Sequence, residues 1–432
     1  MSQLRRDFLK TSLMAAGSAA LPAAYDERPT VAAIITEYRY LSHADVIATK
    51  LMEGYEHDGG PGPKLRLAAM YVDQFHDNDM ARELARKHSI PIFDSIEGAI
   101  TMGTQGVAVD GVLSIGEHGQ YPWTKDTNQH MYPRRRFFDG IAATFQKYNK
   151  VVPVFNDKHL AYNWPDAKYM YDLARATEIP LMAGSSIPVA WRIPPLELPR
   201  GCEIEEAIGL GYGGLEAYGF HTLEGMQCQV ERRKGYETGV EAVETFQGRA
   251  AIEDAERRGV WSRELLEAAL EAAPDRLPGR PTVEDYDDKN YAVYRIYYRD
   301  GLKASIVIAS QAVSTFGFAC KLKGESKPRA TAFELQRGTP YRHFGYLIDA
   351  VEPMIRTGKP SYPVERTLLT GGVLDAAMRS LAAGGARIET PYLDIAYEPA
   401  DWPFAPGVPK EPVKPEGSWH HLQKAREQRK KD

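Results

Sequence analysis

Two short groups of residues near the middle of the chain are the first candidates for chemistry. Asp157, Lys158 and His159 follow an apolar run at residues 151–155, and His221 follows a stretch rich in glycine. A lysine ammonium can hold a hydroxyl group and lower its pKa, and a histidine can exchange the hydroxyl proton near neutral pH. We therefore predict Asp157, Lys158 and His221 as catalytic residues of one pocket. The alternatives are an ordinary salt bridge for Lys158 and a core position for His221.

Other polar and aromatic side chains could bind a sugar. Glu117 and His118 follow a second apolar run, at residues 111–115, and residues 121–136 form a long polar segment that contains aromatic residues. Aromatic rings stack on sugar faces, arginine binds hydroxyl groups, and loops of this length are often functional lids. An oligomer contact is the alternative for this segment. The predicted substrate-binding residues are Glu117, His118, Trp123, His130, Arg134 and His159.

The same residue types allow a metal hypothesis. Glu117, His118, His159 and His221 could supply oxygen and nitrogen ligands for a divalent metal. No short ligand spacing such as His-Glu-x-x-His supports it, so unconnected polar loop residues are the alternative.

The elements that would position these residues alternate along residues 25–192. Apolar runs predict strands, and the stretches between them have helical spacing. This alternation predicts a parallel sheet with helices on both faces, and ligands of such sheets lie beyond the carboxyl ends of the strands. The predicted strands are residues 31–35, 65–72, 90–93, 111–115, 151–155 and 179–183, and the predicted helices are 44–51, 79–87, 95–100, 135–148 and 165–177.

The pattern changes after residue 192. Residues 244–280 are charged and predict helix, while residues 291–298 and 302–309 alternate around Arg299-Asp300-Gly301 and predict a hairpin. Two further helices are predicted at 344–355 and 366–382. The fold class is therefore α/β: a Rossmann-like domain at 25–192, an α+β domain with an open, mostly antiparallel sheet at 193–400, and a polar tail at 401–432.

These motifs, in this order, resemble the glucose–fructose oxidoreductase, inositol dehydrogenase and MocA (Gfo/Idh/MocA) group. Asp157-Lys158-His159 stands where that group has Glu-Lys-Pro, and Gly213-Gly214 leading to Gly219-Phe220-His221 is similar to its paired glycines and histidine. The resemblance implies hydride transfer between a sugar or cyclitol and NAD(P), with Lys158 orienting the substrate and the nicotinamide. It also implies a homo-oligomer, because the open sheet mediates subunit contacts in that group.

The chain departs from this group where the cofactor would bind. The three glycines of the dinucleotide fingerprint align with Ile35, Glu37 and Tyr40, and the acidic catalytic partner aligns with Ala217. Side chains there would crowd a pyrophosphate, and Glu37 would repel it. The cofactor positions that the resemblance implies are Thr36, Glu37 and Asp73.

The composition and the N-terminal residues indicate where in the cell the protein acts. The chain has 432 residues and a formal net charge of -5, which gives no basis for nucleic-acid binding. Arg5 and Arg6, then Phe8-Leu9-Lys10 and an apolar run to residue 24, resemble a twin-arginine signal peptide at residues 1–24. We therefore expect a bacterial periplasmic or extracellular protein without a membrane span. A Cys202–Cys228 bridge stays possible.

Three functions remain open from the sequence. The first is an NAD(P)-dependent oxidoreductase that acts on a sugar or polyol. The second is a non-redox carbohydrate-active enzyme, such as a glycoside hydrolase or lyase, with or without a metal. The third is a carbohydrate-binding protein without turnover.

Overall fold

The first domain is built on a parallel sheet. The structure is a computed structural model that describes residues 27–274, 291–310 and 312–415, so the predicted signal peptide lies outside the described residues. Six strands pair in parallel in the order β3-β2-β1-β4-β5-β6. The prediction of a Rossmann-like sheet is confirmed. The strands are β1 (Thr30–Ile35), β2 (Arg66–Val72), β3 (Ile92–Phe93), β4 (Gly111–Ile115), β5 (Val154–Asp157) and β6 (Leu181–Gly184).

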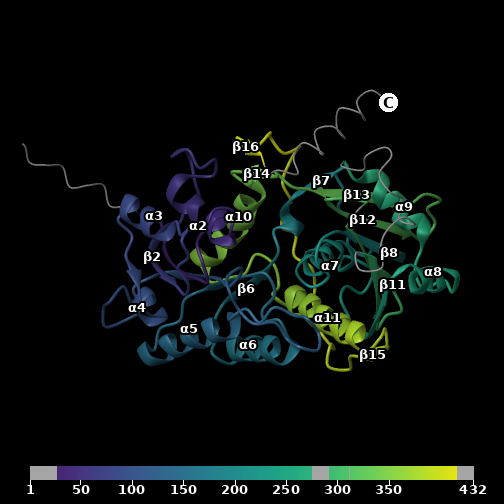
Figure 1. Cartoon of the computed structure of the whole chain (residues 1–432), viewed down its shortest axis with the longest axis horizontal. Coiled ribbons are helices and arrows are strands. Elements are labelled where there is room, and N and C mark those ends of the chain that lie inside the picture. Colours follow the sequence, from purple (N-terminus) through teal and green to yellow (C-terminus); the bar gives the residue numbers. More distant parts are fainter. Residues whose placement is uncertain (1–26, 275–290, 311, 416–432) are drawn as a thin grey trace, which may run out of the picture.

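Helices cover both faces of this sheet, because its strands are mostly apolar on both faces. In β1, Ala32 and Ile34 contact the core under one set of helices, whereas Val31, Ala33 and Ile35 contact the core under the other. Figure 1 shows the first set below the sheet and the second above it. The first set is α4 (Ile96–Thr101), α5 (Arg134–Tyr148) and α6 (Trp164–Ala176), and the second is α2 (His43–Glu53), α3 (Ala81–His88) and α10 (Arg342–Thr357).

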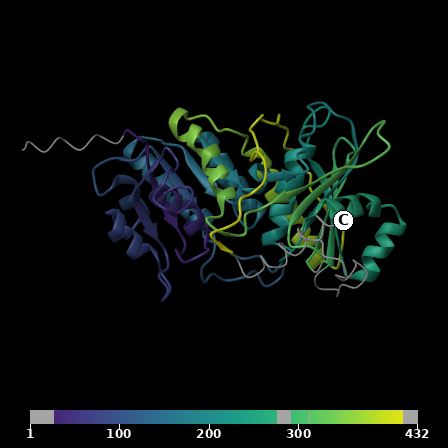
Figure 2. The same ribbon diagram turned by 90° about the horizontal axis from the view of Figure 1, so that it is seen from above.

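The second domain is a mixed sheet of eight strands in the order β15-β9-β10-β11-β8-β12-β13-β7. Its pairs are antiparallel except β11 with β8, so the expected open, mostly antiparallel sheet is confirmed. Figure 2 shows it beside the first domain. The strands are β7 (Trp191–Ile193), β8 (Ile204–Gly211), β9 (Val240–Gln247), β10 (Tyr291–Tyr298), β11 (Lys303–Ala309), β12 (Phe316–Leu322), β13 (Arg329–Glu334) and β15 (Ile388–Glu389).

In the described part of the chain, four helices pack on this second sheet. α7 (Ala217–Val230) and α11 (Glu365–Ala382) share the core on the side of the first domain. α8 (Arg249–Arg257) and α9 (Arg263–Ala272) pack on the other face, over strands that we expected to mediate subunit contacts. The predicted helix at 244–280 is wrong over residues 244–247, which end β9, and its residues 275–280 lie outside the described part.

The C-terminal part of the chain returns to the first domain. Phe344 and Leu347 of α10 share a core with Val31 and Ala33 of β1. Part of the predicted polar tail is bonded to the body, because the amide of Ala405 donates to the carbonyl of Val189 over 3.0 Å. At its described end, β16 (Lys414–Pro415) pairs with β14 (Gly338–Thr339).

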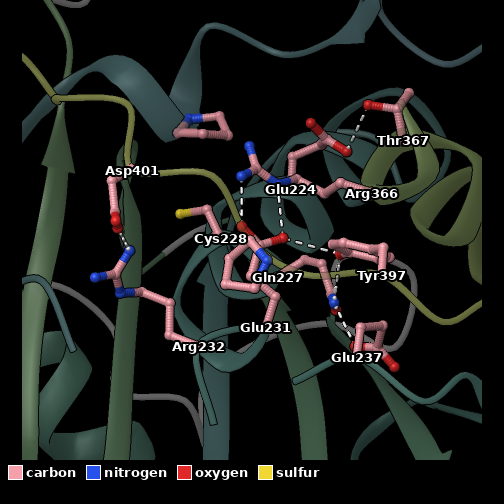
Figure 3. Close-up of polar contacts among 12 residues, drawn as sticks. Glu224, Gln227, Cys228, Glu231, Arg232, Glu237, Arg366, Thr367, Tyr397 and Asp401 are labelled. Carbon is pink, nitrogen blue, oxygen red and sulfur yellow. Dashed lines mark hydrogen bonds and ion pairs between the residues drawn. The ribbon is translucent and has the colours of Figure 1, made fainter. Parts of the chain in front are cut away.

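A buried polar network fixes α7 against α11 and the C-terminal segment (Figure 3). Nε of Arg366, on α11, donates to the carboxylate of Glu231 over 2.9 Å, and the hydroxyl of Tyr397 donates to the same carboxylate over 2.8 Å. The three cysteines are free, so the Cys202–Cys228 bridge is not formed. Among the described residues, no helix combines the length and the apolar character needed to cross a bilayer.

Candidate functional site

A cavity of about 360 Å³ lies where the carboxyl ends of the parallel strands meet α7 and α10. It is lined by side chains from both domains, including aromatic rings and several histidines. This position is where open α/β sheets bind their ligands. The lining residues that can carry or move a proton include His43, Glu117, His118, Lys158, His221 and His343.

Lys158 enters the cavity from an unusual backbone position. Its φ of +66° lies in the left-handed region, which costs a residue with a Cβ about 1–3 kcal/mol. Two backbone hydrogen bonds with Gly184 hold this conformation: the Lys158 amide donates over 3.0 Å, and its carbonyl accepts over 3.1 Å. The ammonium lies 2.9 Å from Oε1 of Glu117. The charge is therefore fixed in the cavity wall.

Glu117 lies between two cations. Besides Lys158, its carboxylate contacts the guanidinium of Arg134, whose side chain is fully buried. Burial alone would raise the pKa of Glu117, but Lys158 and Arg134 outweigh burial and hold it well below its ordinary value. Arg134 also contacts Nε2 of His159 over 3.0 Å. Glu117 is therefore an anion that holds the ammonium of Lys158 in place, and Arg134 and His159 lie behind it.

His221 faces Lys158 from the second domain. It lies in the second turn of α7, which follows the glycine-rich stretch. Its Nδ1 is 2.6 Å from the hydroxyl of Ser185. Burial, and then the positive charge of Lys158, lower the pKa of His221 well below its ordinary value. The imidazole is therefore neutral near neutral pH, and it lines the same cavity as Lys158.

His43 was missed as a functional residue in the sequence. It is the first residue of α2, and its Nδ1 lies 2.6 Å from Oδ2 of Asp157 at the end of β5. The two residues are 114 positions apart, so no local pattern links them. The available signal was its position just beyond the first strand, at the edge where ligands bind. Asp157 itself is buried and contacts the cavity through His43.

Four predicted substrate-binding residues, Trp123, His130, Arg134 and His159, are not among the residues that line the cavity. Trp123, 51% exposed, stacks on His130 with ring centroids 4.2 Å apart. Tyr132 from the same segment does line the cavity. The metal set is not assembled either: the described residues hold no group of three histidine, cysteine or acidic side chains suited to a metal ion. Glu117 contacts two cations instead.

The loop where a dinucleotide pyrophosphate would lie is filled by the chain's own side chains. The carboxylate of Glu37 accepts from Nε of Arg39 over 2.6 Å and lies 3.0 Å from Nε2 of His76. Tyr38 is buried below the loop, where its hydroxyl lies 2.7 Å from that of Thr49. A pyrophosphate would meet a buried carboxylate here instead of glycine backbone.

The amides around the start of α2 are also engaged. The amide of Leu41 donates to the carboxylate of Asp45 over 3.0 Å, and the amide of Asp45 donates to the hydroxyl of Ser42 over 3.3 Å. These groups would otherwise bind phosphate oxygens. Thr36 donates its hydroxyl to the carbonyl of Glu117 over 2.6 Å.

Asp73, where a ribose would be held, accepts from the hydroxyls of Tyr71 and Tyr121 over 2.5 and 2.7 Å and from Arg136 over 2.6 Å. With these oxygens engaged and the loop filled, the residues present do not fit a dinucleotide bound as in Rossmann enzymes.

Comparison with known proteins shows the class of fold. No protein-family model and no curated protein matches the chain. Solved structures match across both domains. GenD2 from gentamicin A biosynthesis, solved in complex with NAD, is 11% identical with a TM-score of 0.51, and the match covers 85% of this chain and 99% of that one.

Two further structures have the same TM-score of 0.51. They are scyllo-inositol dehydrogenase from Lactobacillus casei, 9% identical, and an NAD-binding oxidoreductase from Klebsiella pneumoniae, 12% identical; each match covers 84% of this chain and 98% of that chain. The chain therefore has the two-domain fold of Gfo/Idh/MocA-type NAD-binding oxidoreductases, as Lys158 and the residues around His221 suggested. The likeness concerns the fold.

Proposed function

We propose that the protein is an enzyme that binds a small carbohydrate or polyol and moves protons at its oxygen-bearing carbons without a dinucleotide. The favoured substrate class is a glycoside with one ring hydroxyl oxidised to a ketone, and the favoured reaction is lyase- or hydrolase-type. A ketone acidifies the neighbouring C–H bond, so such a substrate needs a base and a cation near the oxygen but no hydride acceptor.

One observation carries this proposal: the cavity holds a fixed ammonium beside several imidazoles, while the dinucleotide loop next to it is filled. Lys158 is held by Glu117 at 2.9 Å and lines the same cavity as His43 and His221. Glu37, paired with Arg39 and His76, takes the place of the second fingerprint glycine. Proton transfer requires the ammonium and the imidazoles, and it does not require a bound dinucleotide.

A second candidate is an NAD(P)-dependent oxidoreductase of a sugar or polyol. A hollow of about 580 Å³ lined by Glu37, Phe75, His76 and Gly119, among others, lies beyond β1, β2 and β4. This is the side of the sheet where Rossmann domains hold the adenosine half of the cofactor. The shared fold with NAD-binding enzymes also supports it.

Two measurements separate these functions. First, NADH and NADPH fluorescence is titrated with the purified protein, and we expect no binding up to millimolar nucleotide. Second, a methyl hexopyranosidulose, which is a methyl glycoside with one ring ketone, is incubated with the protein without nucleotide and followed by proton NMR. We expect turnover or proton exchange that Lys158→Met abolishes and the surface variant Lys147→Met retains.

The outcomes differ clearly. Micromolar nucleotide binding, with sugar turnover that depends on it, establishes the second candidate and refutes the first. No sugar binding and no turnover in either assay refutes both and leaves a protein without catalysis. We also propose action outside the cytoplasm, supported by the signal peptide that the sequence predicts at residues 1–24. Retention of the leader and of the protein in cytoplasmic fractions would contradict that.

A further inference from the structure

We infer that His43 is the general base of the cavity and that Asp157 positions it. This inference rests on the proposed function and names the group that removes the proton. It differs from the sequence prediction, in which Asp157 was grouped with Lys158 and His221 and His43 had no role.

The contact between the two residues sets the tautomer of the imidazole. Nδ1 of His43 lies 2.6 Å from Oδ2 of Asp157, and the aspartate side chain is 1% exposed. A carboxylate offers only acceptors, so in the neutral imidazole Nδ1 carries the proton and Nε2 keeps its lone pair. His43 lines the cavity and its side chain is 13% exposed. Nε2 is therefore available to a ligand, while Nδ1 is bonded to the buried carboxylate of Asp157.

Neighbouring rings hold the plane of this imidazole. The ring of Phe344 meets it edge-on with centroids 5.1 Å apart, and the ring of His118 lies 5.4 Å away. A base held on three sides loses little orientational freedom when a ligand arrives, which is what positioned proton transfer requires.

The backbone brings the base and the cation to one cavity. Successive side chains of a strand point to opposite faces, so Asp157 and Lys158 would diverge in a regular strand. The left-handed φ of +66° at Lys158 breaks that alternation. Asp157 can then contact His43 while the ammonium of the next residue lines the same cavity. The strain at Lys158 thus has a use in the site.

Accepting a proton turns an imidazole into a cation, so the best base has an anion beside it. Among the cavity histidines that the structure describes, His43 alone is hydrogen-bonded to a carboxylate. Nδ1 of His118 faces the guanidinium of Arg39 at 3.4 Å, and His221 contacts a neutral hydroxyl. Two cations, Lys50 and Arg337, act on His343. Burial outweighs the favourable charge of Glu117 on His118, and burial together with these contacts disfavours imidazolium at the other three positions.

The step itself balances without a further reagent. Nε2 of His43 takes the proton from the carbon next to the ketone, and the C–H electron pair becomes the enolate. The ammonium of Lys158 stabilises the enolate oxygen. Return of a proton from imidazolium to carbon regenerates the ketone, with solvent hydrogen in place of the original one. If an oxygen substituent leaves the β carbon instead, its C–O bond breaks as the C=C bond forms, and the imidazolium proton neutralises the leaving oxygen.

Deuterium exchange measures this step directly. Methyl hexopyranosidulose in D₂O is incubated with the full chain, and loss of the C–H signal next to the ketone is followed by NMR. His43→Gln is expected to lower the exchange kcat at least about 100-fold with little change in KM, because general-base catalysis contributes factors of this size. Asp157→Asn is expected to lower it by about 10-fold or more. His88→Gln, a variant of a histidine paired with Glu53 away from the cavity, retains the wild-type rate.

A second readout reports on Asp157 without turnover. Imidazole ¹⁵N NMR of the wild type should show the Nδ1–H tautomer for His43, assigned by its loss in His43→Gln, and Asp157→Asn should shift that signal. Wild-type exchange that survives His43→Gln refutes the base assignment while the proposed function stands. An Nε2–H tautomer, or a signal unmoved by Asp157→Asn, refutes the positioning role. Wild-type protein without exchange or turnover overturns the proposed function and this inference together.

Discussion

The buried charges behind the cavity give the sharpest prediction about stability. Arg134 is fully buried, and the side chains of its partner Glu117 and of Lys158 are 6% and 5% exposed. Arg134→Met keeps most of the volume of the side chain but leaves Glu117 with one cation instead of two. Removing one member of a buried ion pair costs about 3–5 kcal/mol. We expect a loss of that size in the free energy of unfolding.

Urea unfolding at pH 7, followed by circular dichroism, measures this loss. Arg135→Met is the matched control, because the next residue of the same helix makes half-exposed pairs with Asp139 and Asp166. A partly exposed pair is worth about 0–1 kcal/mol. The double variant Glu117→Gln/Arg134→Met should cost less than the sum of the single variants, since the two residues contact each other.

The sign of the pH dependence gives an independent check. The folded-state pKa of Glu117 is held well below its unfolded value, so its contribution is fully present above the unfolded pKa and is lost as the pH falls below it. Glu117→Gln should therefore flatten the acid limb of the stability curve. If Arg134→Met costs no more than Arg135→Met, and the acid limb is unchanged in Glu117→Gln, the buried charges do not hold the site and the reasoning fails.

Three further predictions concern neighbouring positions. Burial, and then the charge of Glu117, raise the pKa of Glu216 to about 7, so the ionised form is costly in the fold; Glu216→Gln should be more stable than wild type by about 1–3 kcal/mol in urea at pH 8, and this difference should vanish as the pH falls below the unfolded-state pKa. A Cβ on Gly184 (φ +132°) would lie 2.7 Å from the carboxylate of Glu224, so Gly184→Ala should lower the free energy of unfolding by about 2–4 kcal/mol, against about 1 kcal/mol for Gly259→Ala, where a Cβ meets open space. Because Trp123 stands outside the cavity lining, Trp123→Ala should leave the KM for the keto-glycoside within about two-fold of wild type; a ten-fold rise would establish residues 121–136 as a substrate lid.

Sequence reasoning found the elements whose signals are local. The run at 111–115 is apolar except for Ser114, and it forms a strand with the same bounds. The helix prediction failed at residues 244–247 because the least buried residues of β9, Glu241, Glu244 and Gln247, are three apart and so resemble one face of a helix. Hydrogen bonding to β10 and β15 decided the strand, and no window of sequence contains that contact.

The site was accessible from sequence only in part. Lys158 and His221 could be named because each belongs to a recognisable motif. The left-handed backbone at Lys158 depends on Gly184, which follows it by 26 residues, and the function of His43 depends on Asp157, 114 residues away. Glu37 could be seen as a departure from the fingerprint, but its pairing with Arg39 and His76 required coordinates.

The filled loop and the histidine at the start of α2 both alter the site where a dinucleotide-binding domain holds the pyrophosphate. In a dinucleotide-binding domain the positive end of this helix stabilises a pyrophosphate, by about 0.3–1 kcal/mol per anionic charge at an exposed site. That same end opposes a protonated His43. The hydrogen bond to the carboxylate of Asp157 is charge-assisted and worth about 1.5–3 kcal/mol, so it outweighs the helix. Restoring glycine at Glu37 would reopen the loop but would leave His43 and Asp157 in place. The proton chemistry at this edge of the sheet therefore depends more on the pair of His43 and Asp157 than on the absence of the fingerprint glycines.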